Sequence, residues 1–254
     1  METLDKLKIL AESAKYDVSC SSSGGVKRKS NNKSVGSIHT SGICHSFTAD
    51  GRCVSLFKIL LSNSCIYDCK YCINKVTNDI KRATFTPREV CELTISFYKR
   101  NYIEGLFLSS AIVKNPNYTM ELLVQTVIML RTEYHFKGYI HLKAIPGADQ
   151  ILITKAGLYV DRLSANIELP SKDSLKILAP QKTYKDILTP MHTISQKLLE
   201  SEQTKTKTKE LFVPAGQSTQ MIVGASPEAD GHIIRLSEEL YNRFSLKRVY
   251  YSSY

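Results

Sequence analysis

Short apolar runs alternate with longer amphipathic segments from Cys53 to the end of the chain. Such runs, bounded by polar and turn-forming residues, are typical of buried strands, and they lie at 54–61, 105–113, 138–145, 158–167, 220–225 and 247–252. Because amphipathic segments separate the runs, successive strands are expected to be parallel. About six such units close or curl into a barrel more readily than they stay open. The pattern predicts an α/β fold with a partial (β/α)6 TIM-like barrel.

Helix start signals lie between the apolar runs. Thr86, Pro87 and Glu89 form a capping-box pattern ahead of apolar positions at helical spacing. Further helices are expected at 4–15, from near 119 to 134, at 171–178, at 183–203 and at 227–244. The last of these would begin at a second cap-and-proline pattern, Ser226-Pro227-Glu228. No GxGxxG fingerprint follows a predicted strand, which argues against a dinucleotide-binding doubly wound fold.

The chain divides by composition near residue 52. Residues 19–37 are rich in glycine, serine and other polar residues, with too few apolar side chains to pack alone. We therefore expect 1–52 to contain an amino-terminal helix and a flexible or lid segment, and 53–254 to form the partial barrel. Because the last predicted strand ends close to the carboxyl terminus, we also expect a carboxy-terminal extension to be lacking.

Composition is that of a folded globular protein. A chain of 254 residues with 43% hydrophobic residues can bury a large core. No stretch approaches the roughly 20 apolar residues that span a bilayer, and the amino terminus lacks a signal-peptide core. We expect a cytoplasmic protein without a membrane partner. Seven cysteines, an odd number, are better explained as thiols used as ligands than as a disulfide framework.

The chain is basic, with a formal charge of +10 and a pI near 9.2. Positive charge favours polyanionic partners such as nucleic acid, because each phosphate contact releases counterions. The basic residues are nevertheless scattered, and the two short clusters at 27–33 and 205–209 are typical of solvated loops or helix ends. Charge alone therefore does not identify the partner.

Three cysteines, Cys65, Cys69 and Cys72, lie within eight positions directly after the first predicted strand. Barrel enzymes build their sites at this carboxyl end of the strands. A structural zinc site needs four protein ligands, and a second cysteine pair is absent here. A [4Fe-4S] cluster held by three thiolates instead leaves one iron open. The alternative is zinc, with His45, Cys44 or Cys53 as the fourth ligand.

The CxxxCxxC spacing, with the aromatic Tyr71 directly before the third cysteine, resembles the radical SAM enzyme superfamily. That resemblance implies a [4Fe-4S] cluster whose open iron binds the amino and carboxylate groups of S-adenosylmethionine, and an electron donor that reduces the cluster. Cofactor cleavage then gives a 5'-deoxyadenosyl radical that takes a hydrogen atom from the substrate. Tyr71 would flank the cluster and the nucleoside.

The resemblance also assigns residues after the second predicted strand. Family members often have GGE there, where the backbone receives the methionine amino group. The matching residues here are Ser109, Ser110 and Ala111, so main chain and serine hydroxyls would make this contact without an acidic residue.

Ser164, Asn166 and Glu168 alternate with apolar residues and would share one face of a strand, where they suit the ribose hydroxyls. A polar strand end that faces solvent is the alternative. Gly224, in IVGAS, resembles the position where the backbone approaches adenine, although a glycine that merely ends a strand explains it almost as well.

Lys143 and His141 share a face of the third predicted strand. A lysine inside a barrel is costly unless paired, so we predict a functional role for Lys143, with either the methionine carboxylate or a substrate phosphate. For His141 a hydrogen-bonded core position is the simpler interpretation.

Longer stretches at 17–25, 42–75 and 212–230 resemble a subgroup, the DNA modification or repair radical SAM proteins associated with uracil-DNA glycosylase-like partners. This resemblance implies a DNA substrate and such a partner. Members of the subgroup usually continue into a helix-hairpin-helix type DNA-binding region, and this sequence ends before one.

The remaining cysteines stay ambiguous. Cys20 and Cys44, with His45, would bind a second metal, place a resolving thiol or simply be buried. Cys53 and Cys91 are predicted to be structural. Two alternative functions stay open: a non-enzymatic, metal-stabilised module that binds nucleic acid or a partner, and a radical SAM enzyme that acts on a protein or small metabolite.

Overall fold

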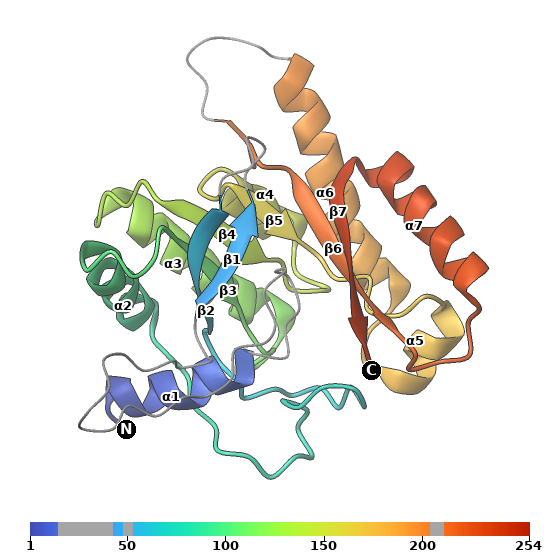
Figure 1. Cartoon of the computed structure of the whole chain (residues 1–254), viewed down its shortest axis with the longest axis horizontal. Helices are drawn as coiled ribbons and strands as arrows, with labels where there is room; N and C mark the ends of the chain where they lie inside the picture. Colours follow the sequence, from blue (N-terminus) through green and yellow to red (C-terminus); the bar gives the residue numbers. More distant parts are fainter. Residues whose placement is uncertain (15–42, 48–52, 204–210) are drawn as a thin grey trace, which may run out of the picture.

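The computed structural model of the chain describes residues 1–14, 43–47, 53–203 and 211–254. Seven strands form one curved sheet in the order β1 to β7, with helices on its outer side (Figure 1). The strands are β1 (Ile43–Phe47), β2 (Cys53–Leu60), β3 (Gly105–Ser109), β4 (Tyr139–Lys143), β5 (Arg162–Ser164), β6 (Gln217–Val223) and β7 (Leu246–Ser253). The helices are α1 (Thr3–Ser13), α2 (Pro87–Lys99), α3 (Pro116–Thr132), α4 (Gln150–Gly157), α5 (Lys172–Leu178), α6 (Tyr184–Gln203) and α7 (Asp230–Phe244).

The predicted partial barrel is confirmed. Each of the six predicted apolar runs overlaps one of the strands β2 to β7, and each of these strands is parallel to the next. Helical connections between successive parallel strands place the carboxyl ends of all six at the same rim of the half-barrel. β5 is much shorter than its predicted run, 158–167, because only three residues pair with β4 before the chain leaves the sheet.

Most of the predicted helices are confirmed, with two corrected starts. The capping box at Thr86 is present, since its side chain accepts from the Glu89 amide and the Glu89 carboxylate accepts from the Thr86 amide. α3 begins at Pro116, where Asn115 is the N-cap, instead of near Thr119. α7 begins at Asp230, so Ser226-Pro227-Glu228 does not start it. α4 was not predicted.

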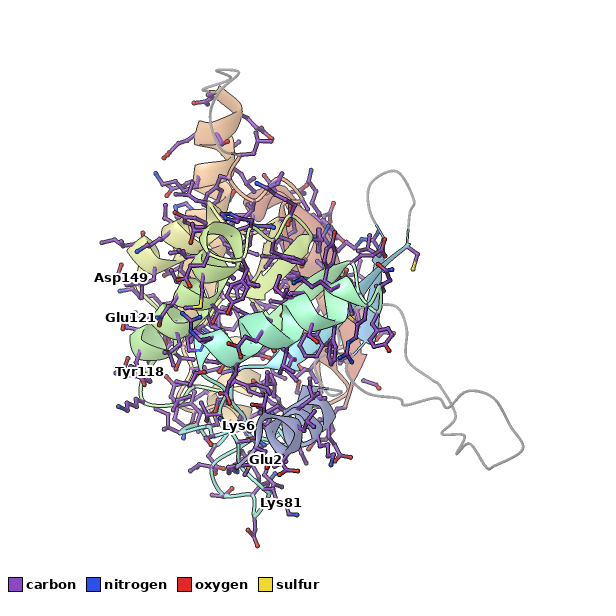
Figure 2. The ribbon with its side chains drawn as sticks, turned by 90° about the vertical axis from the view of Figure 1, so that its left-hand side faces the viewer. Glu2, Lys6, Lys81, Tyr118, Glu121 and Asp149 are labelled. Carbon is purple, nitrogen blue, oxygen red and sulfur yellow. The ribbon has the colours of Figure 1, made fainter. Side chains whose placement is uncertain are left out.

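The amino-terminal part differs from the expectation in one respect. α1 confirms the predicted helix, but β1, which was not predicted, pairs antiparallel with β2. Lys6 on α1, labelled in Figure 2, forms an ion pair of 2.8 Å with Glu89 at the start of α2, and this pair joins the two helices. Most of the predicted lid, Cys20 and both basic clusters at 27–33 and 205–209 lie outside the described residues.

Alternation along the strands separates two packed faces. Phe57 on β2 packs edge to face against Phe97 on α2, with ring centroids 5.0 Å apart, in the layer between sheet and helices. Phe107 on β3 faces the inside of the half-barrel, where its ring lies 4.5 Å from that of His141. Within the described residues, no helix is long and apolar enough to span a membrane.

Candidate active site

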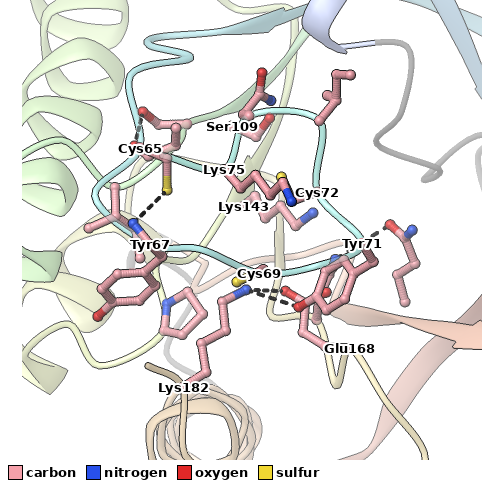
Figure 3. A pocket seen from close by; sticks show the side chains of 18 of the residues that line it. Cys65, Tyr67, Cys69, Tyr71, Cys72, Lys75, Ser109, Lys143, Glu168 and Lys182 are labelled. Carbon is pink, nitrogen blue, oxygen red and sulfur yellow. Dashed lines mark hydrogen bonds and ion pairs between the residues drawn. The ribbon is translucent and has the colours of Figure 1, made fainter. Parts of the chain in front are cut away.

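A cavity of about 530 Å³ opens at the carboxyl ends of the strands (Figure 3). Its volume falls in the range of roughly 300–1,000 Å³ that is usual for small-molecule and cofactor sites. The loop after β2 forms one wall, and the ends of β3, β4, β6 and β7 contribute further lining residues. This is the rim at which barrel enzymes place their reactive groups.

The loop that follows β2 brings the three predicted cysteines together. Cys65, Cys69 and Cys72 all line the cavity, and each has a free thiol. Figure 3 shows their sulfur atoms arranged around one space, with Lys143 reaching into it from β4. The spacing of three and two residues therefore brings all three cysteines to the lining of one cavity.

The cysteine thiols lie in an environment that resists ionisation. Desolvation by burial raises the pKa of Cys69 to about 11, and the nearby Glu168 carboxylate adds to the rise while Lys182 opposes it. Burial also raises the pKa of Cys72. Thiolates at Cys69 and Cys72 would be stable only beside compensating positive charge, such as that of bound iron.

Three thiols are the type of donor that holds a [4Fe-4S] cluster. Among the residues that the structure describes, no three His, Cys, Asp or Glu side chains are close enough together to hold one metal ion. Cys44 is buried against Leu56 and Phe107, and Cys53 is exposed at the start of β2. Neither cysteine lines the cavity. Three thiols spread around the cavity match a [4Fe-4S] cluster with one open iron.

Both serines predicted after β3 line the cavity. Ser109 is buried, and its hydroxyl has no hydrogen-bond partner within the described part of the chain. Buried polar atoms normally have a partner, so an unsatisfied hydroxyl beside a cavity indicates a ligand that completes it. The Ser110 hydroxyl instead donates to the carbonyl oxygen of Ala111 at 2.7 Å.

The three polar residues predicted to share a face of β5 do not all reach the cavity. Asn166 and Glu168 line the cavity, whereas Ser164 does not. Its hydroxyl lies 2.9 Å from His141 Nε2, so His141 is the hydrogen-bonded core histidine that the sequence indicated. The prediction that all three residues share one strand was wrong, because β5 ends at Ser164.

Glu168 is held in an unusual backbone conformation. Its φ of 66° lies in the left-handed region, and backbone hydrogen bonds to Gln220 and Ile222 fix it on both sides. A non-glycine residue in this region is strained, and such strain is often found at functional sites. In this conformation Glu168 lines the cavity.

Lys182 lies beside Glu168 and was not predicted. Its ammonium is 2.7 Å from Glu168 Oε1 and 3.5 Å from the Tyr71 hydroxyl (Figure 3). Desolvation lowers the pKa of Lys182, but Glu168, Tyr71 and Cys69 outweigh it and the pKa lies well above the usual range. Lys182 therefore connects Tyr71 of the cysteine loop to the carboxylate of Glu168, which follows β5.

The segment before α6 also fixes the cysteine loop through the backbone. The Lys70 amide donates to the Leu178 carbonyl at 2.7 Å, and the Asp68 amide donates to Gln181 Oε1 at 3.4 Å. Together with the Tyr71 contact, these bonds hold the part of the loop that carries Cys69 against the end of α5.

Three further cavity residues lie on or after the last two strands. Gln220 accepts a hydrogen bond from Asn166 at 3.5 Å and donates one to Ser252 at 3.1 Å, and Tyr254 follows at the end of β7. Gly224 has a φ of 84° and does not line the cavity. Among the described residues, its two chain neighbours aside, no heavy atom lies within 4 Å of the place where a Cβ would stand at Gly224.

No protein-family model matches the chain, and no curated protein sequence matches it. Solved structures do. The chain resembles methylornithine synthase (PylB) with a TM-score of 0.59 and 15% identity, over 77% of this chain and 52% of that one. It resembles HydG, a maturase of the [FeFe]-hydrogenase, with a TM-score of 0.55 and 15% identity, over 76% of this chain and 41% of that one.

The HydG maturase of Carboxydothermus hydrogenoformans gives a similar result, with a TM-score of 0.57 and 12% identity over 76% of this chain and 43% of that one. The chain thus spans about half or less of the length of these proteins. At such low identity the likeness shows the fold. The chain shares an α/β half-barrel architecture with these proteins.

Proposed function

We propose that this protein is a radical SAM enzyme that binds a [4Fe-4S] cluster and S-adenosylmethionine and modifies or repairs nucleic acid. One observation supports it most: three cysteines of an eight-residue segment line one cavity at the carboxyl rim of a half-barrel. Cys65, Cys69 and Cys72 would hold the cluster. When bound, the cluster and S-adenosylmethionine together would supply a 5'-deoxyadenosyl radical for hydrogen abstraction.

The chain's own residues would bind and orient the nucleoside. The Ser109 hydroxyl, which has no partner among the described residues, would accept a hydrogen bond from the methionine amino group, and Ser110 would lie beside it. Lys143, at the carboxyl end of the neighbouring strand β4, offers positive charge to a carboxylate or to a substrate phosphate. Tyr71 would flank the cluster.

Asn166 and Glu168 would bind the ribose hydroxyls. Lys182 donates to Glu168 Oε1, which leaves Oε2 as the oxygen that would accept from a hydroxyl. Ser164 and Gly224 have less support from the cavity lining, because neither residue lies in it. For Gly224 the open space above its Cα remains consistent with close approach of a base.

A DNA substrate and a uracil-DNA glycosylase-like partner are proposed from the subgroup resemblance, with an external electron donor. The formal charge of +10 and the lysines of the cavity are compatible with a phosphate-bearing substrate. Binding of labelled DNA across a salt series tests this, because phosphate contacts weaken steeply as salt rises. Salt-independent or absent binding would favour a protein or small metabolite as substrate.

The enzymatic proposal is tested by anaerobic reconstitution with iron and sulfide, chemical reduction and assay of 5'-deoxyadenosine. The wild-type chain should release 5'-deoxyadenosine, and Cys65→Ala, Cys69→Ala and Cys72→Ala should not. Cys53→Ala is the matched control, since Cys53 is exposed and outside the cavity. Tightly bound zinc with no cofactor cleavage would instead support a metal-stabilised binding module.

A further inference from the structure

Arg82 lies where the cysteine loop ends, and its guanidinium donates four hydrogen bonds to backbone carbonyl oxygens. The acceptors are Asn63 at 2.6 Å, Asn74 at 2.9 Å, Lys75 at 2.7 Å and Asn78 at 2.8 Å. Three of these carbonyls belong to the stretch that directly follows Cys72. Arg82 does not line the cavity, so it acts on the loop from behind.

The backbone on both sides of Arg82 is itself held by hydrogen bonds. Asn63 Oδ1 accepts from the Ala83 amide at 2.8 Å, and Asn63 Nδ2 donates to the Lys81 carbonyl at 2.9 Å. Ser62 and Thr84 form an antiparallel bridge, and their hydroxyls are 2.7 Å apart. The two ends of the loop are thus joined on either side of Arg82, which limits the positions its guanidinium can reach.

Backbone amides in the same stretch of the loop donate hydrogen bonds within the segment that carries the cysteines. The Cys72 amide donates to the Cys69 carbonyl at 2.9 Å, and the Lys75 amide donates to the Cys72 carbonyl at 3.2 Å. The Val76 amide donates to the Tyr67 carbonyl at 2.9 Å. Two peptide units that bind Arg82 through a carbonyl, 74–75 and 75–76, therefore donate through their amides to the carbonyls of Cys72 and Tyr67.

Arg82 has no carboxylate partner within the described ranges, so its charge is met by carbonyl dipoles alone. A planar guanidinium can bond several carbonyls at once and stays protonated, whereas a lysine ammonium is a point charge with three donors. Lysine at position 82 could therefore keep the charge but not the four-carbonyl arrangement.

We propose that Arg82 is a positioning residue for the metal-ligand loop: by binding the carbonyls at 63, 74, 75 and 78, it holds Cys72 where the three sulfurs can share one cluster. The nature of the bound cluster rests on the proposed function. The effect of Arg82 on the loop does not, because the hydrogen bonds are present in the chain by itself.

The test compares Arg82→Lys and Arg82→Gln with two matched controls. Lys81→Gln removes a charge from the adjacent, exposed position at the lower edge of Figure 2. Arg131→Gln removes a second guanidinium that bonds carbonyls, those of Phe136, Gly138 and Tyr159, and that also pairs with the Asp161 carboxylate, outside the cavity lining. Arg131→Gln reports what the loss of such an arginine does to stability alone.

Two readouts are measured on the purified full chain. Amide hydrogen exchange of the cluster-free protein should become faster at Cys72, Lys75 and Val76 in both Arg82 variants and stay unchanged there in both controls. After anaerobic reconstitution, iron and sulfide bound per folded chain should fall about 10-fold or more in the Arg82 variants, the loss typical when outer-shell partners of metal ligands are removed. Circular dichroism confirms that each variant is folded.

Unchanged exchange at these three amides in Arg82→Lys and Arg82→Gln would overturn the proposal, whether or not the wild type binds a cluster. Faster exchange with wild-type iron content would also overturn it. If the wild type itself takes up no cluster, the proposed function fails, and the exchange data alone then decide whether Arg82 orders the loop. Arg82→Lys should resemble Arg82→Gln; full rescue by lysine would show that charge, not carbonyl geometry, matters.

Discussion

The ammonium of Lys182 lies 2.7 Å from Glu168 Oε1, and both side chains line the cavity that the three cysteines surround. Each side chain is about nine-tenths buried, with 12% and 10% exposed. A buried pair of this kind contributes little net stability, but removal of one partner leaves the other charge buried and unpaired.

Lys182→Met should therefore lower the free energy of unfolding by about 3 kcal/mol, measured by urea denaturation. Lys182→Arg keeps the charge and should lose much less. Adding Glu168→Leu to Lys182→Met should restore part of the loss, since no charge is then left unpaired. A double variant less stable than Lys182→Met would contradict this account of the pair.

Ser109→Ala should separate stability from cofactor binding. Because the Ser109 hydroxyl is buried without a partner among the described residues, its removal should leave the free energy of unfolding unchanged or slightly higher. Affinity for S-adenosylmethionine should fall by about 1 kcal/mol, or roughly fivefold. Ser110→Ala is the control, since that hydroxyl is already bonded to Ala111. A clear loss of stability without loss of affinity in Ser109→Ala would refute the assignment.

Gly224 allows backbone and ligand effects to be distinguished. Its φ of 84° is unfavourable for alanine, so Gly224→Ala should destabilise the fold by about 1 kcal/mol, while Gly224→Asn should lose less because asparagine tolerates this region. Neither side chain meets a neighbour at its Cβ. If adenine approaches here, both variants should bind S-adenosylmethionine several-fold more weakly; wild-type affinity in both would exclude that contact.

Glu228 predicts a pH dependence of stability. Desolvation raises the pKa of Glu228, but hydrogen bonds from the hydroxyls of Ser171 and Ser174 outweigh it and lower the pKa from 4.5 to about 2. Since the folded-state pKa is depressed, the stabilisation is full above about pH 4.5 and disappears as pH falls toward 2.

Glu228→Gln should thus be less stable than wild type by about 1 kcal/mol at pH 6, and the difference should shrink as pH falls to 3. Urea denaturation at the two pH values measures it. Glu238→Gln, on the exposed side of α7, is the control and should show no such dependence. An equal difference at both pH values would show that the carboxylate charge at 228 is not involved.

Much of the fold follows from local signals in the sequence. Strands β2, β3 and β4 are buried apolar runs, and the Thr86 capping box marks the start of α2 by side-chain chemistry alone. β1 could not be predicted in this way, because its sequence ICHSF is short and gains its pairing only from the neighbouring β2. α4 was not predicted either: it has only eight residues, and it lies between the apolar runs at 138–145 and 158–167.

The sequence indicated the clustered cysteines and the polar residues at the ends of predicted strands. The cysteines, Ser109, Lys143, Asn166 and Glu168 all line the cavity. Lys182 could not be found, because a lysine in the loop between two helices has the same appearance as a surface residue and becomes buried only by tertiary packing. Gln220 did give a signal, since it is a polar residue within a buried apolar strand.

The most direct test of the central claim is electron paramagnetic resonance of the anaerobically reconstituted and reduced chain, recorded with and without S-adenosylmethionine. The account predicts the signal of a reduced [4Fe-4S] cluster that changes when the nucleoside is added, because one iron is open to bind it. A cluster signal that stays identical with S-adenosylmethionine, or a chain that holds a single metal ion and no cluster, would contradict it.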